Sequence, residues 1–149
     1  MQLTRAADYA VRVMIHMAGL PPGTRASRSE LADAVECPEQ FLSKVLQSLT
    51  RGGLVVSHRG NTGGFELPNM HRHASLLEVV EAIEGRIRLN VCLAGEHSCT
   101  RQAWCPAHDV WIEAQASLVA VLQKATVGEM AERATARKPV EQPKPVEWN

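Results

Sequence analysis

Residues 37–67 read CPEQFLSKVLQSLTRGGLVVSHRGNTGGFEL, and this stretch decides the fold. Its first half predicts an amphipathic helix that begins at Cys37-Pro38, with Pro38 at its first position, and ends at Gly52-Gly53. The apolar residues at helical spacing are Phe41, Leu42, Val45, Leu46 and Leu49. Residues 54–58 and 65–67 read as two strands around a glycine-rich turn, so we expect a β-hairpin after the helix.

The outer face of the predicted helix is polar, and we assign no acidic residue to it. Such a face suits the major groove of DNA, although taken alone it is more often a solvated surface. The hairpin turn shifts this balance, because Arg59 beside flexible glycines fits a wing tip that approaches the DNA backbone. The candidate DNA contacts are Ser27, Arg28, Gln40, Ser43, Lys44, Gln47, Arg51, Arg59, Asn61 and Thr62.

Two helices are expected before this stretch. Residues 4–19 place Arg5, Asp8, Arg12 and His16 on one polar stripe, and Ser27 with Glu30 forms a capping box that opens a short helix to about Val35. Two helices, an amphipathic helix with a polar outer face and a hairpin follow the order of a winged helix-turn-helix. The fold class is therefore mostly α with a small β-hairpin wing.

Further capping boxes mark the C-terminal half. Ser75 with Glu78 opens a helix to Glu84, and Thr126 with Glu129 opens a last helix to roughly Arg137. Between them, Cys105-Pro106 begins a long helix to about Lys124. The predicted organisation is a DNA-binding domain at 1–85, a cluster-binding loop at 86–105, dimerisation and closing helices at 106–137, and a proline-containing disordered tail at 138–149.

The long helix needs a partner for its apolar stripe. A small winged-helix domain already closes its own core, so the economical partner is the same helix of a second copy, in a twofold homodimer. The stripe contains Val110, Trp111, Ala114, Leu118, Val121 and Leu122. Such a dimer would hold two recognition helices at the fixed separation that a pseudo-palindromic operator in double-stranded DNA requires.

The composition bounds the class of protein. The 149 residues contain 16 basic and 16 acidic side chains and are 45% hydrophobic, so one globular domain is expected. Residues 40–72 are mildly basic, because the only acidic residue among them is Glu66. The basic residues are Lys44, Arg51, Arg59 and Arg72, so a polyanion would bind there. We expect a cytoplasmic protein without a membrane partner, because neither a membrane span nor a leader is evident. We find no dinucleotide-binding motif, no phosphate-binding loop and no nucleophile–base pair, so the sequence does not indicate an enzyme.

Three of the four cysteines are clustered. Cys92, Cys99 and Cys105 are spaced C-x6-C-x5-C, and His108 follows three residues later. In a cytoplasmic chain this grouping suggests metal or redox chemistry, with zinc or an iron–sulfur cluster as candidates. Structural zinc usually uses C-x2–4-C pairs, so the wide spacing favours iron–sulfur. His97 is a reserve ligand, whereas Cys37 is expected to cap the helix or to be buried, and to be inert.

These features together resemble the family of winged-helix bacterial regulators that includes the iron–sulfur regulator IscR, the nitric-oxide sensor NsrR and the iron regulator RirA. The resemblance covers about 1–135 and rests on the opening MQLTRAADYAVR, the helix FLSKVLQ, the wing GLV…RGNTGGF and the closing TVGEM. It implies a homodimeric regulator, with repressor as the favoured type. Its operator affinity would depend on a cluster that senses iron–sulfur status, redox stress or nitric oxide.

The resemblance also implies the ligands. Cys92, Cys99 and Cys105 match the family's cluster ligands; His108 matches the fourth ligand of 2Fe–2S members and is favoured, while Asp8 of the partner subunit matches that of 4Fe–4S members. The first cysteine interval is one residue longer than in IscR-like members, and Ser43 replaces an acidic residue, so operator preference is not carried over. A regulator with structural zinc or no cofactor is the alternative.

Overall fold

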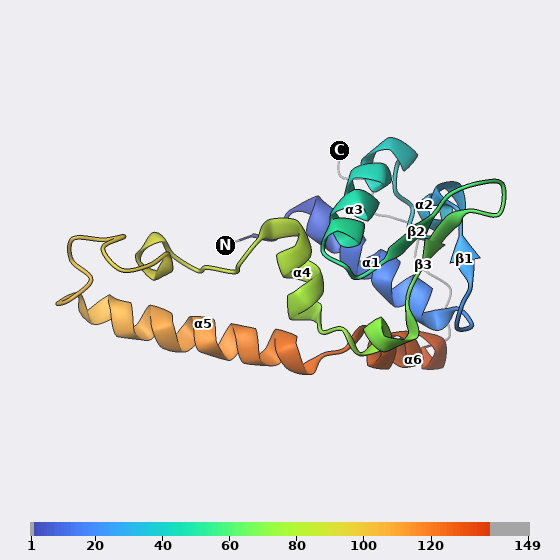
Figure 1. The fold of residues 1–149 in the computed structure, drawn as a ribbon. Helices are drawn as coiled ribbons and strands as arrows, with labels where there is room; N and C mark the ends of the chain where they lie inside the picture. The colour runs from blue at the N-terminus through green and yellow to red at the C-terminus, as the bar shows by residue number, and fades with distance from the viewer. Residues whose placement is uncertain (1, 138–149) are drawn as a thin grey trace, which may run out of the picture.

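The computed structural model describes residues 2–137 as a helical body with a three-stranded sheet at one end and a long excursion at the other (Figure 1). The elements are α1 (Arg5–Gly19), β1 (Arg25–Ala26), α2 (Arg28–Ala34), α3 (Glu39–Arg51), β2 (Val56–His58), β3 (Gly64–Glu66), η1 (Asn69–His73), α4 (Leu76–Glu84), η2 (Val91–Leu93), α5 (Pro106–Lys124) and α6 (Val127–Ala136). None of the helices described is long and apolar enough to cross a membrane. The tail predicted at 138–149 lies outside the described residues.

Helix α1 is the centre of the core. Its buried side chains are mostly small or flexible, and α3, α4 and α6 all pack against it. Ala7 and Ala10 let neighbouring backbones approach, while Met14 and Met17 fill the remaining space. The leucines of α3 complete the same cluster, with Leu42, Leu46 and Leu49 fully buried.

Local capping chemistry sets most helix boundaries. The three predicted capping boxes are confirmed, at Ser27 with Glu30, Ser75 with Glu78 and Thr126 with Glu129. The predicted start of α3 was one residue early. Pro38 has an extended ψ of 130° and is the N-cap, so the helix begins at Glu39.

Phe41 has the apolar spacing of the predicted helix but does not belong to its buried face. Its side chain is 38% exposed. The ring lies edge-on to Tyr9 of α1, with 5.7 Å between ring centroids. The buried face of α3 is therefore narrower than the sequence pattern indicated. It consists of Leu42, Val45, Leu46 and Leu49.

The sheet contains a strand that the sequence analysis missed. Strand β1 pairs antiparallel with β3, and β3 pairs with β2, so the order is β1-β3-β2. Gly64 makes this packing possible: its φ is +136°, and a Cβ there would lie 2.7 Å from the carbonyl oxygen of Ala26. Two residues of strand are too short to show an alternating pattern, so only the long-range pairing defines β1.

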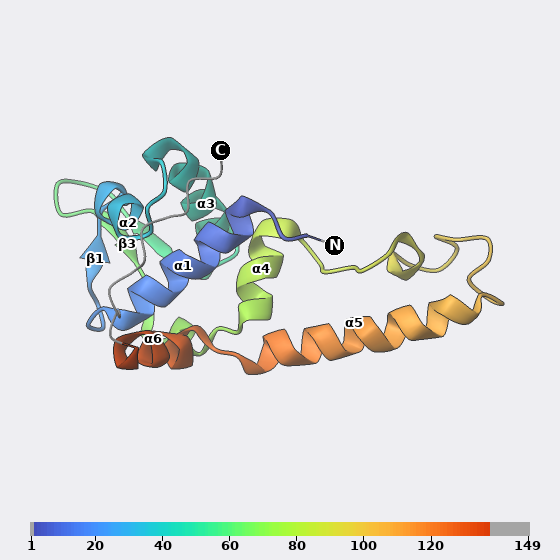
Figure 2. The ribbon, with the colours of Figure 1, turned by 180° about the vertical axis from the view of Figure 1, so that it is seen from behind.

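A short backbone bridge brings the chain back to the body after α5. The amide of Leu76 donates to the carbonyl of Ala125 at 2.8 Å, and the amide of Val127 donates to the carbonyl of Ala74 at 2.9 Å. Helices α4 and α6 therefore start side by side. The residues between them leave the body as a loop and return along α5 (Figures 1 and 2).

The segment 85–125, called the excursion below, packs only weakly against the rest of the chain. Helix α5 has no buried residue in the described structure, and Val110 and Val121 are 63% and 66% exposed. Two side chains hold the start of the loop: Glu81 accepts a hydrogen bond from the amide of Ile87 at 3.1 Å, and Gln115 accepts one from the amide of Leu89 at 3.0 Å. The rest of the loop contains η2 and turns.

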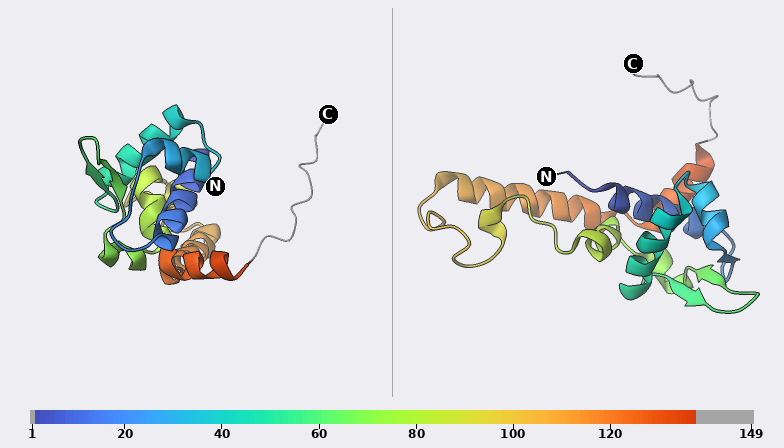
Figure 3. Two further views of the ribbon diagram at one scale, coloured as in Figure 1. Left: turned by 90° about the vertical axis from the view of Figure 1, so that its right-hand side faces the viewer. Right: turned by 90° about the horizontal axis from the view of Figure 1, so that it is seen from above.

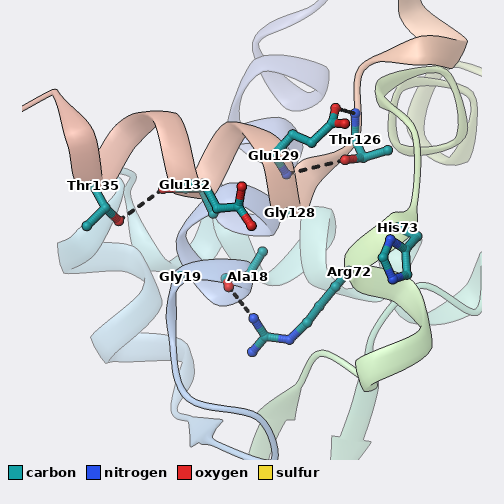
Figure 4. A pocket seen from close by; sticks show the side chains of 10 residues that line it. Ala18, Gly19, Arg72, His73, Thr126, Gly128, Glu129, Glu132 and Thr135 are labelled. Atoms are coloured by element: carbon teal, nitrogen blue, oxygen red, sulfur yellow. Dashed lines mark hydrogen bonds between the residues drawn. The ribbon is translucent and has the colours of Figure 1, made fainter.

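Arg72 caps the C-terminal end of α1 and does not contribute to a DNA-facing basic patch. The prediction that it belongs to the basic region that binds a polyanion was therefore wrong. The guanidinium of Arg72 donates hydrogen bonds to the carbonyls of Ala18 and Leu20 at this helix end. Figure 4 shows the bond to Ala18. Helix α6 lies against the same place. A Cβ at Gly128 would stand 2.8 Å from the carbonyl oxygen of Arg72, so this contact requires glycine.

We predict that Gly128→Ala lowers the free energy of unfolding by about 1–3 kcal/mol, because the added methyl group must push α6 away from η1. Urea denaturation measures the change. Gly19→Ala is the matched control, since nothing lies within 4 Å of a Cβ at that helical position. Equal stability of the two variants would contradict the close contact.

Candidate nucleic-acid interface and cysteine loop

A groove runs between α3 and the wing formed by β2, β3 and their connecting turn. Its volume is about 570 Å³, and it is lined by Arg28, Ser43, Gln47, Thr50, Arg51, Ser57 and Phe65. Four of the predicted DNA contacts, Arg28, Ser43, Gln47 and Arg51, therefore meet at one surface. A smaller depression at the start of α3, lined by Arg28, Glu39, Gln40 and Ser43, adjoins it.

The remaining predicted contacts lie around this groove. Lys44 is exposed on α3, and Arg59, Asn61 and Thr62 are exposed in the turn at the tip of the wing. The hydroxyl of Ser27 accepts a hydrogen bond from the amide of Glu30 and so caps α2. Arg28 at the start of α2 lines the groove, and the exposed tip of the wing adjoins it, so both could contact phosphates beside α3.

Two charged residues at this surface, Arg25 and Glu39, were not predicted. Arg25 of β1 supports the wing from below, with Nη1 3.5 Å from the carbonyl oxygen of Thr62 and Nε 3.7 Å from a carboxylate oxygen of Glu66. Glu39 contradicts the prediction that the outer face of α3 has no acidic residue. Its spacing of four from Ser43 could have placed it on that face.

Cys37 stands apart from the other cysteines, as predicted. It is only 6% exposed and belongs to the core cluster. Burial raises the pKa of its thiol, which keeps the group protonated and unreactive.

The other three cysteines lie in the excursion. Cys92 is in η2, Cys99 is in the loop and Cys105 is the N-cap of α5; all three are half-buried free thiols. A pocket of about 530 Å³ is lined by Glu96, His97, Cys99, Thr100, Gln102, Ala103 and His108. It brings one of the cysteines together with both candidate histidines.

The loop does not assemble a complete ligand set. Among the residues described, no three His, Cys, Asp or Glu side chains lie close enough together to hold a metal ion. Coordination by all three thiols therefore requires the loop to close around the metal. Asp8 lies on α1 and pairs with Arg12 at 2.9 Å, with both side chains about half exposed.

The donor chemistry nevertheless fits an iron–sulfur cluster. The three thiols are free, and the Nδ1 atom of His108 is buried without a hydrogen-bond partner. An unpaired buried nitrogen is costly, and coordination to a metal would satisfy it. His108 stands in the first turn of α5, where its amide donates to the carbonyl of Cys105 at 3.0 Å.

The fold and the groove define a winged helix-turn-helix protein. The family model described as "Rrf2: Iron-dependent Transcriptional regulator" matches residues 3–133, so the chain belongs to the Rrf2 family of DNA-binding transcription regulators. Relatives from Mycobacterium tuberculosis and Shouchella clausii are named as HTH-type transcriptional regulators, not as enzymes.

Individual comparisons agree with this assignment. The chain is 36% identical over 132 residues to Protein aau3 of Rhizobium meliloti, covering 87% of this chain and 84% of that protein. It is 30% identical over 131 residues to the HTH-type transcriptional regulator NsrR of Shouchella clausii, covering 87% and 88%. The solved structure of T. potens IscR has the same fold, with a TM-score of 0.70 at 22% identity and coverage of 93% of both chains.

We predict that Lys44→Ala and Arg59→Ala weaken operator binding without unfolding the protein, because both side chains are exposed beside the groove. Each lost phosphate contact lowers the salt dependence of log K by about one, or about two for a dimer. Fluorescence anisotropy with labelled operator DNA at several salt concentrations measures both quantities. Arg133→Ala, an exposed charge on α6, is the control, and wild-type behaviour of both groove variants would exclude these contacts.

Proposed function

We propose that this regulator is a homodimeric repressor whose affinity for its operator is controlled by an iron–sulfur cluster bound to Cys92, Cys99 and Cys105. The observation that carries the proposal is three free, half-buried thiols in one excursion, one of which, Cys99, shares a pocket with His108, whose Nδ1 is buried and unpaired. The description of the family as iron-dependent supports it.

The DNA-binding half of the proposal follows from the groove. Helix α3 would enter the major groove, with Ser43, Gln47 and Arg51 directed toward the base edges. The wing would reach the adjacent DNA backbone through Arg59. Two such units in a dimer would bind two half-sites of one operator. Occupying a promoter in this way is how such a protein would repress transcription.

The cysteine loop is the proposed sensor. When bound, an iron–sulfur cluster supplies a redox-active centre that oxygen and nitric oxide can damage. The three thiolates would hold it, and either His108 of the same chain or Asp8 of the partner subunit would complete it. His108 is favoured, with a 2Fe–2S cluster, because it needs no rearrangement between subunits and its Nδ1 is unpaired. A 4Fe–4S cluster corresponds to Asp8, which must first leave Arg12.

Residues at the base of the excursion would carry the signal to the DNA-binding body. The carboxylate of Glu84, at the end of α4, accepts hydrogen bonds from the amide of Thr4, at 3.0 Å, and from the Thr4 hydroxyl. Thr4 caps α1, so the point where the loop leaves the body is tied to the start of the central helix. A loop that closes or opens would therefore pull on α1.

The dimer would form through α5. Its large apolar side chains are exposed in the single chain, including Val110, Trp111, Ile112 and Val121. Covering them with the same helix of a second copy would remove this apolar surface from water.

One observation favours the alternative function, a regulator with structural zinc or no cofactor. Among the residues described, no three His, Cys, Asp or Glu side chains are arranged to hold a metal ion, which is compatible with a regulator that holds no cofactor. Zinc would bind without colour and without sulfide, which the following experiment detects.

We predict that Cys92→Ala, Cys99→Ala and Cys105→Ala each prevent cluster formation, because thiolates bind the iron directly. The measurements are the visible absorption spectrum and the iron and acid-labile sulfide content after anaerobic purification. Cys37→Ala is the matched control and keeps the cluster, since Cys37 is buried in the body. A colourless, sulfide-free wild-type protein would overturn the cluster proposal.

The same spectra identify the fourth ligand. His108→Ala changes the spectrum and speeds cluster loss in air if His108 binds the cluster, whereas Asp8→Ala does so if the partner's carboxylate binds it. A change in Asp8→Ala alone contradicts the preference for His108. No change in either variant points to His97, which lines the same pocket, or to a bound thiol or solvent.

We predict that Val121→Glu converts the dimer into monomers and weakens operator binding at least about ten-fold, because it places a charge in an apolar interface. Sedimentation equilibrium measures the mass. Gln123→Glu adds the same charge at an exposed polar position of α5 and is the control. An unchanged dimer in the Val121 variant would place the interface elsewhere.

A further inference from the structure

An exposed ion pair joins the first residues of the two helices in the helix-turn-helix unit. Arg28 begins α2 and Glu39 begins α3, and the Nε atom of Arg28 donates to a carboxylate oxygen of Glu39 at 2.7 Å. The two side chains are 50% and 47% exposed. Solvent weakens such pairs, so this one contributes little to stability and its position needs another explanation.

The pair stands on the recognition surface. Arg28 and Ser43 line both the depression at the start of α3 and the adjoining groove, so the two form one continuous surface. Glu39 is the only carboxylate among the residues that line them. A carboxylate facing DNA is repelled by phosphates, unless it meets a hydrogen-bond donor on a base.

We propose that Glu39 is a specificity-determining residue that accepts a hydrogen bond from the exocyclic amino group of a cytosine in the major groove, and that Arg28 is the residue that positions it. The proposal rests on α3 entering the major groove. A carboxylate only accepts hydrogen bonds, and cytosine presents an amino donor at N4, whereas guanine and thymine present carbonyl oxygens that would repel it. Adenine also presents an amino donor, at N6, but its N7 acceptor stands beside that group and would repel the carboxylate.

Arg28 has two effects on this carboxylate. The hydrogen bond from Nε fixes the direction of the Glu39 side chain before DNA binds, which lowers the entropy lost on binding. The positive charge also offsets the repulsion between Glu39 and nearby phosphates. The other guanidinium N–H groups of Arg28 remain able to contact a phosphate, so the same arginine would support both affinity and base reading.

A purely structural role for Glu39 makes a different prediction. An acidic residue in the first turn stabilises a helix through its dipole, and its replacement then changes stability but no base preference. The two roles are separated by measuring which bases the protein selects.

The experiment is selection of binding sites from a library of random double-stranded DNA by the full-length protein. Wild-type protein is compared with Glu39→Gln, Glu39→Ala, Arg28→Ala and Arg28→Lys. Glu132→Gln, which removes an exposed carboxylate from α6, is the control for net charge. Competition assays with single-base operator variants then give the discrimination at each position.

We expect the wild type and the Glu132 control to select cytosine at one position of each half-site. Both Glu39 variants lose this preference about ten-fold or more while their binding to the library is not weakened. Arg28→Ala reduces the preference and also weakens binding to all sequences, and Arg28→Lys restores part of the affinity.

Two results would overturn the inference in distinguishable ways. If the wild type selects an operator and the Glu39 variants show the same preference at every position, Glu39 does not read a base, and the proposed function stands. If the wild type selects no sequence, recognition through α3 fails and the role of Glu39 fails with it.

Discussion

Two backbone hydrogen bonds, from Leu76 to Ala125 and from Val127 to Ala74, fix the architecture of this regulator. They place the starts of α4 and α6 side by side, so the 85–125 segment must leave the body and return to the same point. Helix α6 can then cover α1, where Arg72 closes the helix end and Gly128 allows close contact. As a result the cysteine loop and the wing project at opposite ends of the molecule (Figures 1 and 3).

Much of this fold could be predicted from the sequence because its boundaries are set locally. A capping box needs only residues three positions apart, so the boxes that begin at Ser27, Ser75 and Thr126 were placed correctly. Features that depend on distant partners were missed. Strand β1 exists only through β3, the exposure of Phe41 depends on how α3 meets the body, and the bonds of Arg72 reach across more than fifty residues.

The candidate sites divide in the same way. The polar face of α3 follows from helical spacing, although its N-terminal carboxylate, Glu39, was left off that face despite lying four residues before Ser43. For the cysteines, spacing identifies the donors but not their arrangement. Cys92, Cys99 and Cys105 lie in a loop with few regular hydrogen bonds, where no local rule brings side chains together.

The lack of buried residues in α5 has a consequence for folding. A helix of 19 residues is only marginally stable by itself, and this one gains little from its own body. Among the described residues we therefore expect the excursion to open more easily than the body, with amide protons that exchange faster than those of α1. Any ligand or partner that binds only the ordered excursion stabilises it by mass action. If the proposed cluster and the proposed second copy both bind only the ordered excursion, the two events would draw on one equilibrium, and each would promote the other without direct contact between their binding sites.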